Sequence, residues 1–182
     1  MSIALNAIRP TQYARRTTLK MGGEDMDAGL VFSIAGAAIV MAISGTGSAI
    51  GVALAGQAAG GVMSEDPEKF GKMIPLIGIP GTQGFYGFLI GFLVLNKLNL
   101  LAGDIKIPTL NQGIEIFAIC TVVSLVESIS AVWQGKVSVA SIYLVAKKPE
   151  EAGKALVLPI FVEIYAILGL AAAFLLLLGV KI

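Results

Sequence analysis

Residues 156–178 read LVLPIFVEIYAILGLAAAFLLLL, an unbroken apolar run that holds a single carboxylate, Glu163. A helix that crosses a bilayer needs about 20 apolar residues, so this stretch is long enough to span a membrane. A carboxylate at membrane depth costs at least about 2.5 kcal/mol. We therefore expect Glu163 to have polar partners or a function, and we interpret the rest of the sequence around it.

The composition of the whole chain is that of an integral membrane protein. Hydrophobic residues make up 56% of the sequence and charged residues only 14%, against about a quarter charged in soluble proteins. The net charge of +1 gives no electrostatic basis for binding nucleic acid, and the absence of histidine removes the usual zinc and catalytic-triad chemistry. The lone cysteine, Cys120, cannot form an internal disulfide and is expected to be a small buried core residue.

Apolar runs separated by polar breaks predict four transmembrane helices. Three are expected at about residues 30–63, 68–95 and 113–146, and the fourth contains Glu163. The predicted fold is an all-α membrane protein made of two tandem helical hairpins. Its expected divisions are an N-terminal extension at 1–27, a first hairpin at 28–97, a connecting loop at 98–112 and a second hairpin at 113–182.

The two hairpins are predicted to be copies of each other. Residues 64–72, SEDPEKFGK, align with residues 146–154, AKKPEEAGK, through a shared proline, glutamate, glycine and lysine. Downstream of these loops Gln83 aligns with Glu163, so only the second copy carries a carboxylate at this position. A duplication of parallel sense places both hairpin loops on one side of the membrane and both ends of the chain on the other.

The extension at 1–27 differs in kind from the rest of the chain. Its first 20 residues contain basic residues and no acidic one, and acidic residues follow directly (Arg9, Arg15, Arg16 and Lys20; then Glu24, Asp25 and Asp27). This pattern resembles a targeting segment but lacks the continuous apolar core of a secretory signal. A surface tail and a later start of translation at Met21 or Met26 are alternative interpretations.

Small residues are concentrated in the first helix, where Gly45, Gly47 and Gly51 lie within one short stretch. Gly47 and Gly51 are four residues apart and therefore share a helix face that allows two backbones to approach closely. An ordinary close helix pair is one interpretation. We favour the other, in which this face belongs to an inner ring of helices in a tight oligomer, because it is longer than a single helix crossing needs.

Four polar side chains are expected near the middle of the membrane: Thr82 and Gln83 on the second helix, Gln134 on the third and Glu163 on the fourth. Hydroxyl, amide carbonyl and carboxylate oxygens are hard donors that suit a hard cation stripped of water. Without a cation, Glu163 is expected to hold a proton instead. Hydrogen bonding between helices with no ion is the alternative role for Gln83 and Gln134.

Two further groups are expected to complete this set of oxygens. Pro80 frees a backbone carbonyl in the preceding turn, and we expect the carbonyl of Ile79 to be available as a donor to the cation. Tyr86 lies one turn from Gln83 on nearly the same face, where its hydroxyl could hold Glu163 in place.

Glu127 is a second acidic residue within an apolar helix. It lies seven residues before Gln134, which places it on the same face about two turns away. We favour a solvated position near the edge of the membrane. A second titratable group inside the membrane and an ion pair with Lys106 are the alternatives.

Four motifs resemble those of the V-type rotary ATPase proteolipid, the c or K component of the membrane rotor. They are PGTQGFYG at 80–87, QGK at 134–136, KKP at 147–149 and VEIYAILG at 162–169, and the likeness extends over about residues 30–178. The resemblance implies a ring of four-helix protomers of the duplicated-hairpin form. This ring turns against a stator subunit that has an arginine, and it is attached to central-stalk subunits. Glu127 and the extension at 1–27 depart from the family pattern.

The resemblance also implies the composition of an ion site. The Na⁺ ligands of the family carry over onto the Glu163 carboxylate, the Gln83 and Gln134 side-chain carbonyls, the Thr82 hydroxyl and the Ile79 backbone oxygen, with Tyr86 as a tether. All the expected ligand types are present, which favours Na⁺ over a site for H⁺ alone and leaves H⁺ as a competitor.

We therefore interpret the chain as a non-catalytic, ion-translocating component of a rotary ATPase or ATP synthase in the bacterial cell membrane, in a ring of identical or mixed protomers. The family places both hairpin loops in the cytoplasm. A small ion-coupled secondary transporter, a structural membrane oligomer and a duplicated F-type rotor protomer in a mixed c-ring are the alternatives. Transporters more often contain inverted repeats, whereas both loops here have the same sense.

Overall fold

The computed structural model of this chain describes residues 18–21 and 24–182. Before the helices, strands β1 (Thr18–Met21) and β2 (Glu24–Asp27) pair antiparallel as a small hairpin, which the sequence analysis did not predict. The basic residues Arg9, Arg15 and Arg16, on which the targeting interpretation rests, lie outside the described residues.

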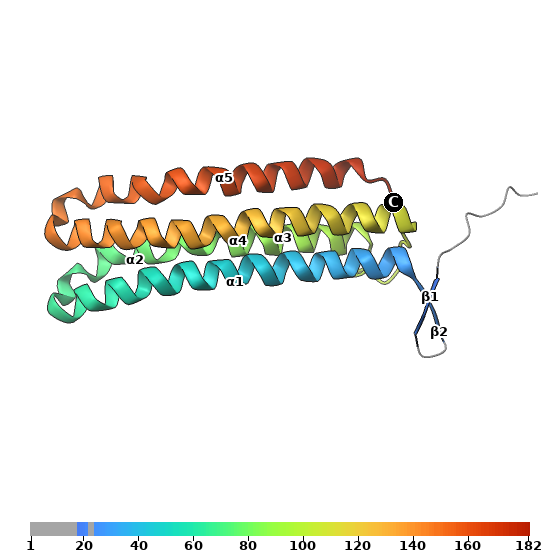
Figure 1. The fold of residues 1–182 in the computed structure, drawn as a ribbon, viewed down its shortest axis with the longest axis horizontal. Coiled ribbons are helices and arrows are strands. Elements are labelled where there is room, and N and C mark those ends of the chain that lie inside the picture. Colours follow the sequence, from blue (N-terminus) through green and yellow to red (C-terminus); the bar gives the residue numbers. More distant parts are fainter. Residues whose placement is uncertain (1–17, 22–23) are drawn as a thin grey trace, which may run out of the picture.

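The first helix of each repeat is long and unbroken. Helix α1 spans Ala28–Glu65 and helix α4 spans Leu110–Lys147, and the two pack side by side along most of their length (Figure 1). The contact is close enough to need glycine on both sides. A Cβ added to Gly47 would lie 2.4 Å from the Cα of Ser128, and one added to Gly135 would lie 2.5 Å from the Cα of Gly51. Any larger side chain at these positions would force the two helices apart.

The second helix of each repeat begins at a proline. In the first repeat the order is a 3₁₀ turn η1 (Pro67–Lys69), α2 (Phe70–Gly78), a second 3₁₀ turn η2 (Ile79–Gly81) and α3 (Thr82–Lys97). In the second repeat a 3₁₀ turn η3 (Pro149–Glu151) leads into one helix, α5 (Ala152–Gly179). Proline suits the first helical position because its missing N–H would have no partner there. The break at η2 follows from Pro80, which lacks the N–H needed to continue the helix.

Four helical segments of the described chain are long and apolar enough to cross a membrane: Ala28–Glu65, Pro67–Lys97, Leu110–Lys147 and Pro149–Gly179. The predicted all-α arrangement of four transmembrane helices in two tandem hairpins is thereby confirmed, and the protein is a multi-pass integral membrane protein. Both hairpin loops lie at one end of the bundle and the C-terminus at the other (Figure 1). The loops touch there, since the Lys69 ammonium donates to the Ala146 carbonyl oxygen at 2.9 Å.

Helix α4 begins at Leu110, three residues before the predicted start and within the expected connecting loop. The earlier start has a local cause, because Thr109 and Gln112 form a capping box in which each side chain bonds the backbone N–H of the other. Such a box satisfies backbone donors that a helix otherwise leaves free at its N-terminus.

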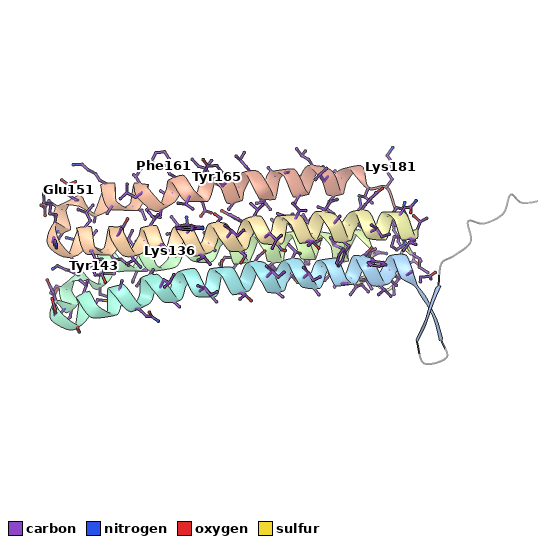
Figure 2. All side chains as sticks on the ribbon, in the orientation of Figure 1. Lys136, Tyr143, Glu151, Phe161, Tyr165 and Lys181 are labelled. Atoms are coloured by element: carbon purple, nitrogen blue, oxygen red, sulfur yellow. The ribbon has the colours of Figure 1, made fainter. Side chains whose placement is uncertain are left out.

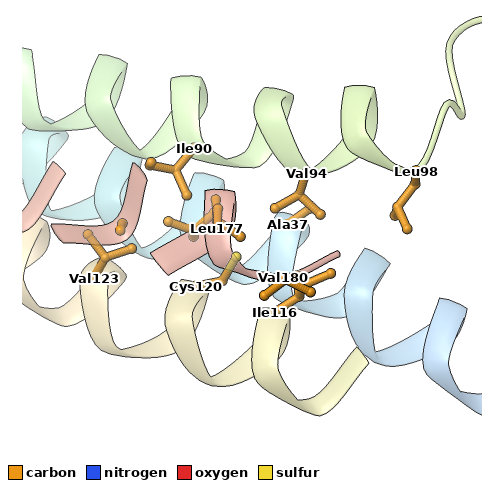
Figure 3. Close-up of a cluster of buried hydrophobic side chains, with 11 residues drawn as sticks. Ala37, Ile90, Val94, Leu98, Ile116, Cys120, Val123, Leu177 and Val180 are labelled. Carbon is orange, nitrogen blue, oxygen red and sulfur yellow. The ribbon is translucent and has the colours of Figure 1, made fainter. Parts of the chain in front are cut away.

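Two apolar clusters fill the interior, one at each end of the bundle. The cluster nearer the chain ends contains Cys120, confirmed as a buried core residue, together with Ala37, Val40, Ile90, Val94, Leu98, Ile116, Val123, Ala173, Leu177 and Val180 (Figure 3). The cluster nearer the loops contains Ala55, Ala59, Met73, Leu76, Ile142, Val145 and Ala155. In all four segments the buried polar side chains fall mainly between these clusters, so the bundle has a polar layer in its middle.

The outer surface of the bundle is apolar, as expected for contact with lipid or with neighbouring subunits. Along α5, for example, Phe161 and Tyr165 point away from the other helices (Figure 2), and they are 63% and 68% exposed. Soluble proteins rarely expose a continuous apolar surface of this kind.

Candidate ion-binding site

The carboxylate of Glu163 is the centre of the polar layer. Its Oε2 accepts hydrogen bonds from the Gln134 amide nitrogen at 2.7 Å, the Thr82 hydroxyl at 2.8 Å and the Gln83 amide nitrogen at 3.2 Å. Its Oε1 accepts one from the Tyr86 hydroxyl at 2.5 Å. Only 7% of Glu163 is exposed. Side chains from α3 and α4 thus converge on one carboxylate of α5.

The break at η2 positions the α3 members of this group. Because the helix restarts at Thr82, both Thr82 and Gln83 lie in its first turn and face α5. Tyr86 follows one turn later on the same face. The predicted convergence of these side chains on Glu163 is what the structure contains, and their role as ion ligands stays a prediction.

The two glutamine amides are fixed by one another and by the backbone. The Gln83 amide nitrogen donates to Gln134 Oε1 at 2.6 Å, and the Gln134 amide nitrogen donates to the Pro159 carbonyl oxygen at 3.0 Å. Both side chains are fully buried. In this arrangement each amide directs its NH₂ group, and not its oxygen, at Glu163.

Ser130 is a member of the site that the sequence analysis missed. Its hydroxyl lies 3.4 Å from the Gln83 amide nitrogen and donates to the Val162 carbonyl oxygen at 3.2 Å. Ser130 stands four residues before Gln134, which is the spacing of neighbours on one helix face and the signal that could have identified it.

The carbonyl of Ile79 is near the site but is not free, contrary to the prediction. It accepts the backbone N–H of Thr82, and the Thr82 hydroxyl lies 2.9 Å from it. Proline at 80 has no N–H to donate to the carbonyl four residues before it, one turn earlier in the helix. The carbonyl that it leaves without a donor is therefore not that of the adjacent Ile79. A hydroxyl has one proton, so Thr82 can donate either to Ile79 or to Glu163.

The three glycines expected to pack a ring differ in their surroundings. Gly47 and Gly51 form the close contact of α1 with α4 inside the chain, which is the simpler of the two interpretations offered for them. A Cβ added to Gly45 would meet nothing within 4 Å. A role of any of the three in contacts between subunits stays a prediction.

Glu127 does not lie at a solvated edge, and that interpretation is wrong. Its side chain is fully buried, and neither carboxyl oxygen has a hydrogen-bond partner among the described residues. The proposed ion pair with Lys106 is therefore absent as well. The reason is the rotation of α4, which turns Glu127 toward the same interior as Gln134.

The charges of the site limit the ions that it can hold. The described residues contain no group of three or more His, Cys, Asp or Glu side chains that could hold a metal ion. Around Glu163 one carboxylate is surrounded by neutral hydroxyl and amide groups. A single positive charge balances this set, whereas a divalent cation would leave an excess charge in an apolar environment.

The pattern of the family of ATP synthase C subunits matches the chain twice, at residues 35–94 and at residues 117–176. The chain belongs to the ATP synthase C-subunit family. The resemblance inferred from the motifs is confirmed at this level, and each match covers one of the two hairpins.

Two relatives of this C-subunit chain extend the match over most of its length. The chain is 40% identical to the V-type sodium ATPase subunit K of Enterococcus hirae over 153 residues, which is 84% of this chain and 94% of that protein. It is 36% identical to the A-type ATP synthase subunit K of Methanocaldococcus jannaschii over 151 residues, which is 83% of this chain and 64% of that protein.

Within this C-subunit chain the two family repeats have different roles at the site. The first repeat supplies Thr82, Gln83 and Tyr86, and the second supplies Gln134 and Glu163. The aligned positions Gln83 and Glu163 face each other at 3.2 Å. Duplication has thus produced one charged site per chain, built from both copies.

Proposed function

We propose that this chain is a rotor-ring subunit of a rotary ATPase in a bacterial membrane, and that it carries Na⁺ across that membrane on Glu163, with H⁺ as the competing ion. Membership of the C-subunit family supports the rotor, and the similarity to a sodium ATPase protein supports the ion. The same similarities favour a rotary subunit over a secondary transporter.

The observation that carries the proposal is the convergence of four polar side chains on one carboxylate inside the membrane. A carboxylate placed there without compensation is strongly destabilising. Four donors stabilise the ionised form, and replacing the amide donors with oxygens would create a site for a cation. The polar layer therefore has the composition that an exchangeable ion requires.

Cation binding requires a rearrangement of the two amides. Gln83 and Gln134 direct nitrogen at Glu163, so each must rotate by about 180° about its terminal bond to present oxygen, since an amide has its donor and acceptor on opposite sides. The Thr82 hydroxyl would then donate to Ile79 and turn its lone pairs to the ion. Tyr86 keeps its bond to Oε1 and holds the carboxylate in place.

Binding of either Na⁺ or H⁺ neutralises the charge of Glu163. We propose that this neutralisation is what allows the ring to rotate. A neutral site can face lipid without the cost of a bare carboxylate. The ion is released when Glu163 meets the proposed stator arginine, which replaces the positive charge of the ion. Other protomers close the ring, and central-stalk subunits connect it to the ATPase part.

The test is carbodiimide modification of Glu163 in the purified ring, followed by mass spectrometry of the peptide. An apolar groove of about 560 Å³ between α4 and α5, lined by Ser130, Val162 and Tyr165 among others, is where we expect an apolar reagent to approach the site. We expect Na⁺ to protect Glu163 and K⁺ to leave it reactive. Equal protection by both ions, or by neither, would contradict the proposal.

A matched control comes from the same helix. The hydroxyl of Ser138 is buried and has no hydrogen-bond partner among the described residues, and it lies one turn beyond Gln134. Ser138→Ala should leave the protection by Na⁺ unchanged, whereas Gln134→Ala should weaken it. If both substitutions act equally, the loss reflects packing of α4 and not the loss of an ion ligand.

A further inference from the structure

The second buried carboxyl of the chain, Glu127, has no assigned role in the site. Glu127 is 0% exposed, and both of its oxygens lack a hydrogen-bond partner among the described residues. By contrast, Gln83, Gln134 and Glu163 all have several partners. A buried polar group without a partner is rare in native proteins and calls for a specific explanation.

No positively charged side chain of the described residues faces Glu127. From α5 it is faced by Gly169, whose added Cβ would lie 3.3 Å from Glu127 Oε1, and further along by Glu163. From α3 the one titratable side chain in the membrane part is Tyr86. Helix α1 has no charged residue between positions 28 and 64. No described group can therefore neutralise an ionised Glu127 by pairing with it.

A carboxylate that is buried in a membrane and has no counter-charge is unstable, and the simplest way to neutralise it is to bind a proton. We propose that Glu127 is a second proton-binding site of this chain, and that losing its proton strengthens cation binding at Glu163. The effect on cation binding rests on the function proposed above for Glu163. The proton-binding site at Glu127 does not depend on that function.

The size of the coupling follows from the spacing of the two sites. Glu127 precedes Gln134 by seven residues, or about 10 Å along the helix, and Gln134 contacts Glu163 directly. A negative charge at this distance in a protein interior attracts a cation enough to change its binding constant by about tenfold. Protonation of Glu127 removes that attraction. The cation affinity of the ring should therefore rise with pH beyond what competition at Glu163 alone produces.

The proton on Glu127 can be observed by infrared difference spectroscopy of the purified ring at neutral pH in saturating Na⁺. We expect a carbonyl band of a protonated carboxylic acid in the wild type that Glu127→Gln lacks, and that disappears at alkaline pH. Glutamine is close in shape to the protonated acid, so this variant should assemble. Coinciding spectra of wild type and Glu127→Gln would overturn the proposal.

Protection of Glu163 from carbodiimide by Na⁺, measured on the same ring, separates the two hypotheses. If Na⁺ does not protect Glu163, the function proposed for Glu163 fails, while the acid band that Glu127→Gln removes still reports on Glu127.

The coupling is tested by calorimetric titration of the ring with Na⁺ at two pH values. At alkaline pH, Glu127→Gln should need about tenfold more Na⁺ than the wild type, and at neutral pH the two should agree. Glu127→Asp keeps an ionisable group, so at alkaline pH it should bind Na⁺ nearly as tightly as the wild type. An equal effect of Glu127→Gln at both pH values would assign it a structural role and overturn the coupling.

Discussion

The two buried carboxyl groups of this protein, Glu127 on α4 and Glu163 on α5, have opposite surroundings, although Glu127 lies only about two helical turns from Gln134, which donates to Glu163. Glu163 receives hydrogen bonds from Thr82, Gln83, Gln134 and Tyr86, whereas Glu127 has none among the described residues. The comparison shows that burial alone does not define an ion site. The donors around a carboxylate decide whether it can be ionised, and ionisation is what cation binding requires.

The largest effect is expected from removing the charge of Glu163. In the assembled complex, Glu163→Gln should abolish ATP-driven Na⁺ uptake into vesicles, because the neutral amide cannot bind the ion through its charge. Ser138→Ala, in the same polar layer, serves as the control and should transport normally. Transport by Glu163→Gln at the wild-type rate would show that Glu163 does not carry the ion, and that its role does not differ from that of Glu127.

Gln134 should have the next largest effect, because it connects Glu163, Gln83 and the Pro159 carbonyl. In the proposed Na⁺-bound state the Gln134 oxygen faces the ion, and a contact of a neutral polar group with a charged group contributes about 1.5–3 kcal/mol, so Gln134→Ala should weaken Na⁺ binding by roughly 10- to 100-fold. The Na⁺ concentration that half-protects Glu163 from carbodiimide measures this change. An unchanged concentration would show that the amide does not contribute to the bound state.

A smaller change is expected from Tyr86, whose hydroxyl donates to Glu163 Oε1. Tyr86→Phe keeps the ring and removes that bond, so Na⁺ binding should weaken by about tenfold. The same half-protection experiment applies. Because phenylalanine fills the same space, a loss of assembly in this variant would indicate a structural role that the hydrogen bond does not explain.

The smallest effect should come from making position 127 apolar. Glu127→Leu removes a polar group that has no partner, so the ring should be stabilised against denaturant by about 1 kcal/mol. Glu163→Leu should instead destabilise the ring, because it leaves the Gln134 and Tyr86 donors unpaired. Equal destabilisation by both substitutions would mean that Glu127 has partners of its own.

Much of this architecture follows from the sequence alone. The length of the apolar runs predicted four membrane helices, and the repeated loops around Pro67 and Pro149 predicted two tandem hairpins. Once this topology is known, few polar residues remain in the apolar segments. Their convergence around Glu163 could therefore be predicted, because polar groups in a membrane are stabilised by pairing with one another.

The details that could not be predicted depend on rotation and depth. Helix α4 has 38 residues, about 57 Å, against an apolar bilayer core of about 30 Å. Composition alone therefore could not decide whether Glu127 lay at the edge or inside. The orientation of the Gln83 and Gln134 amides and the contacts of Ser130 depend on side-chain geometry, which spacing along a helix does not determine.

The most direct test of the central claim is the number of Na⁺ ions bound per chain by the purified ring, measured at neutral pH by equilibrium dialysis with radioactive sodium. We predict one ion per chain in the wild type and in Glu127→Gln, and none in Glu163→Gln. Stoichiometric binding by Glu163→Gln, or no saturable binding by the wild type, would contradict the claim that Glu163 is the ion-carrying carboxylate.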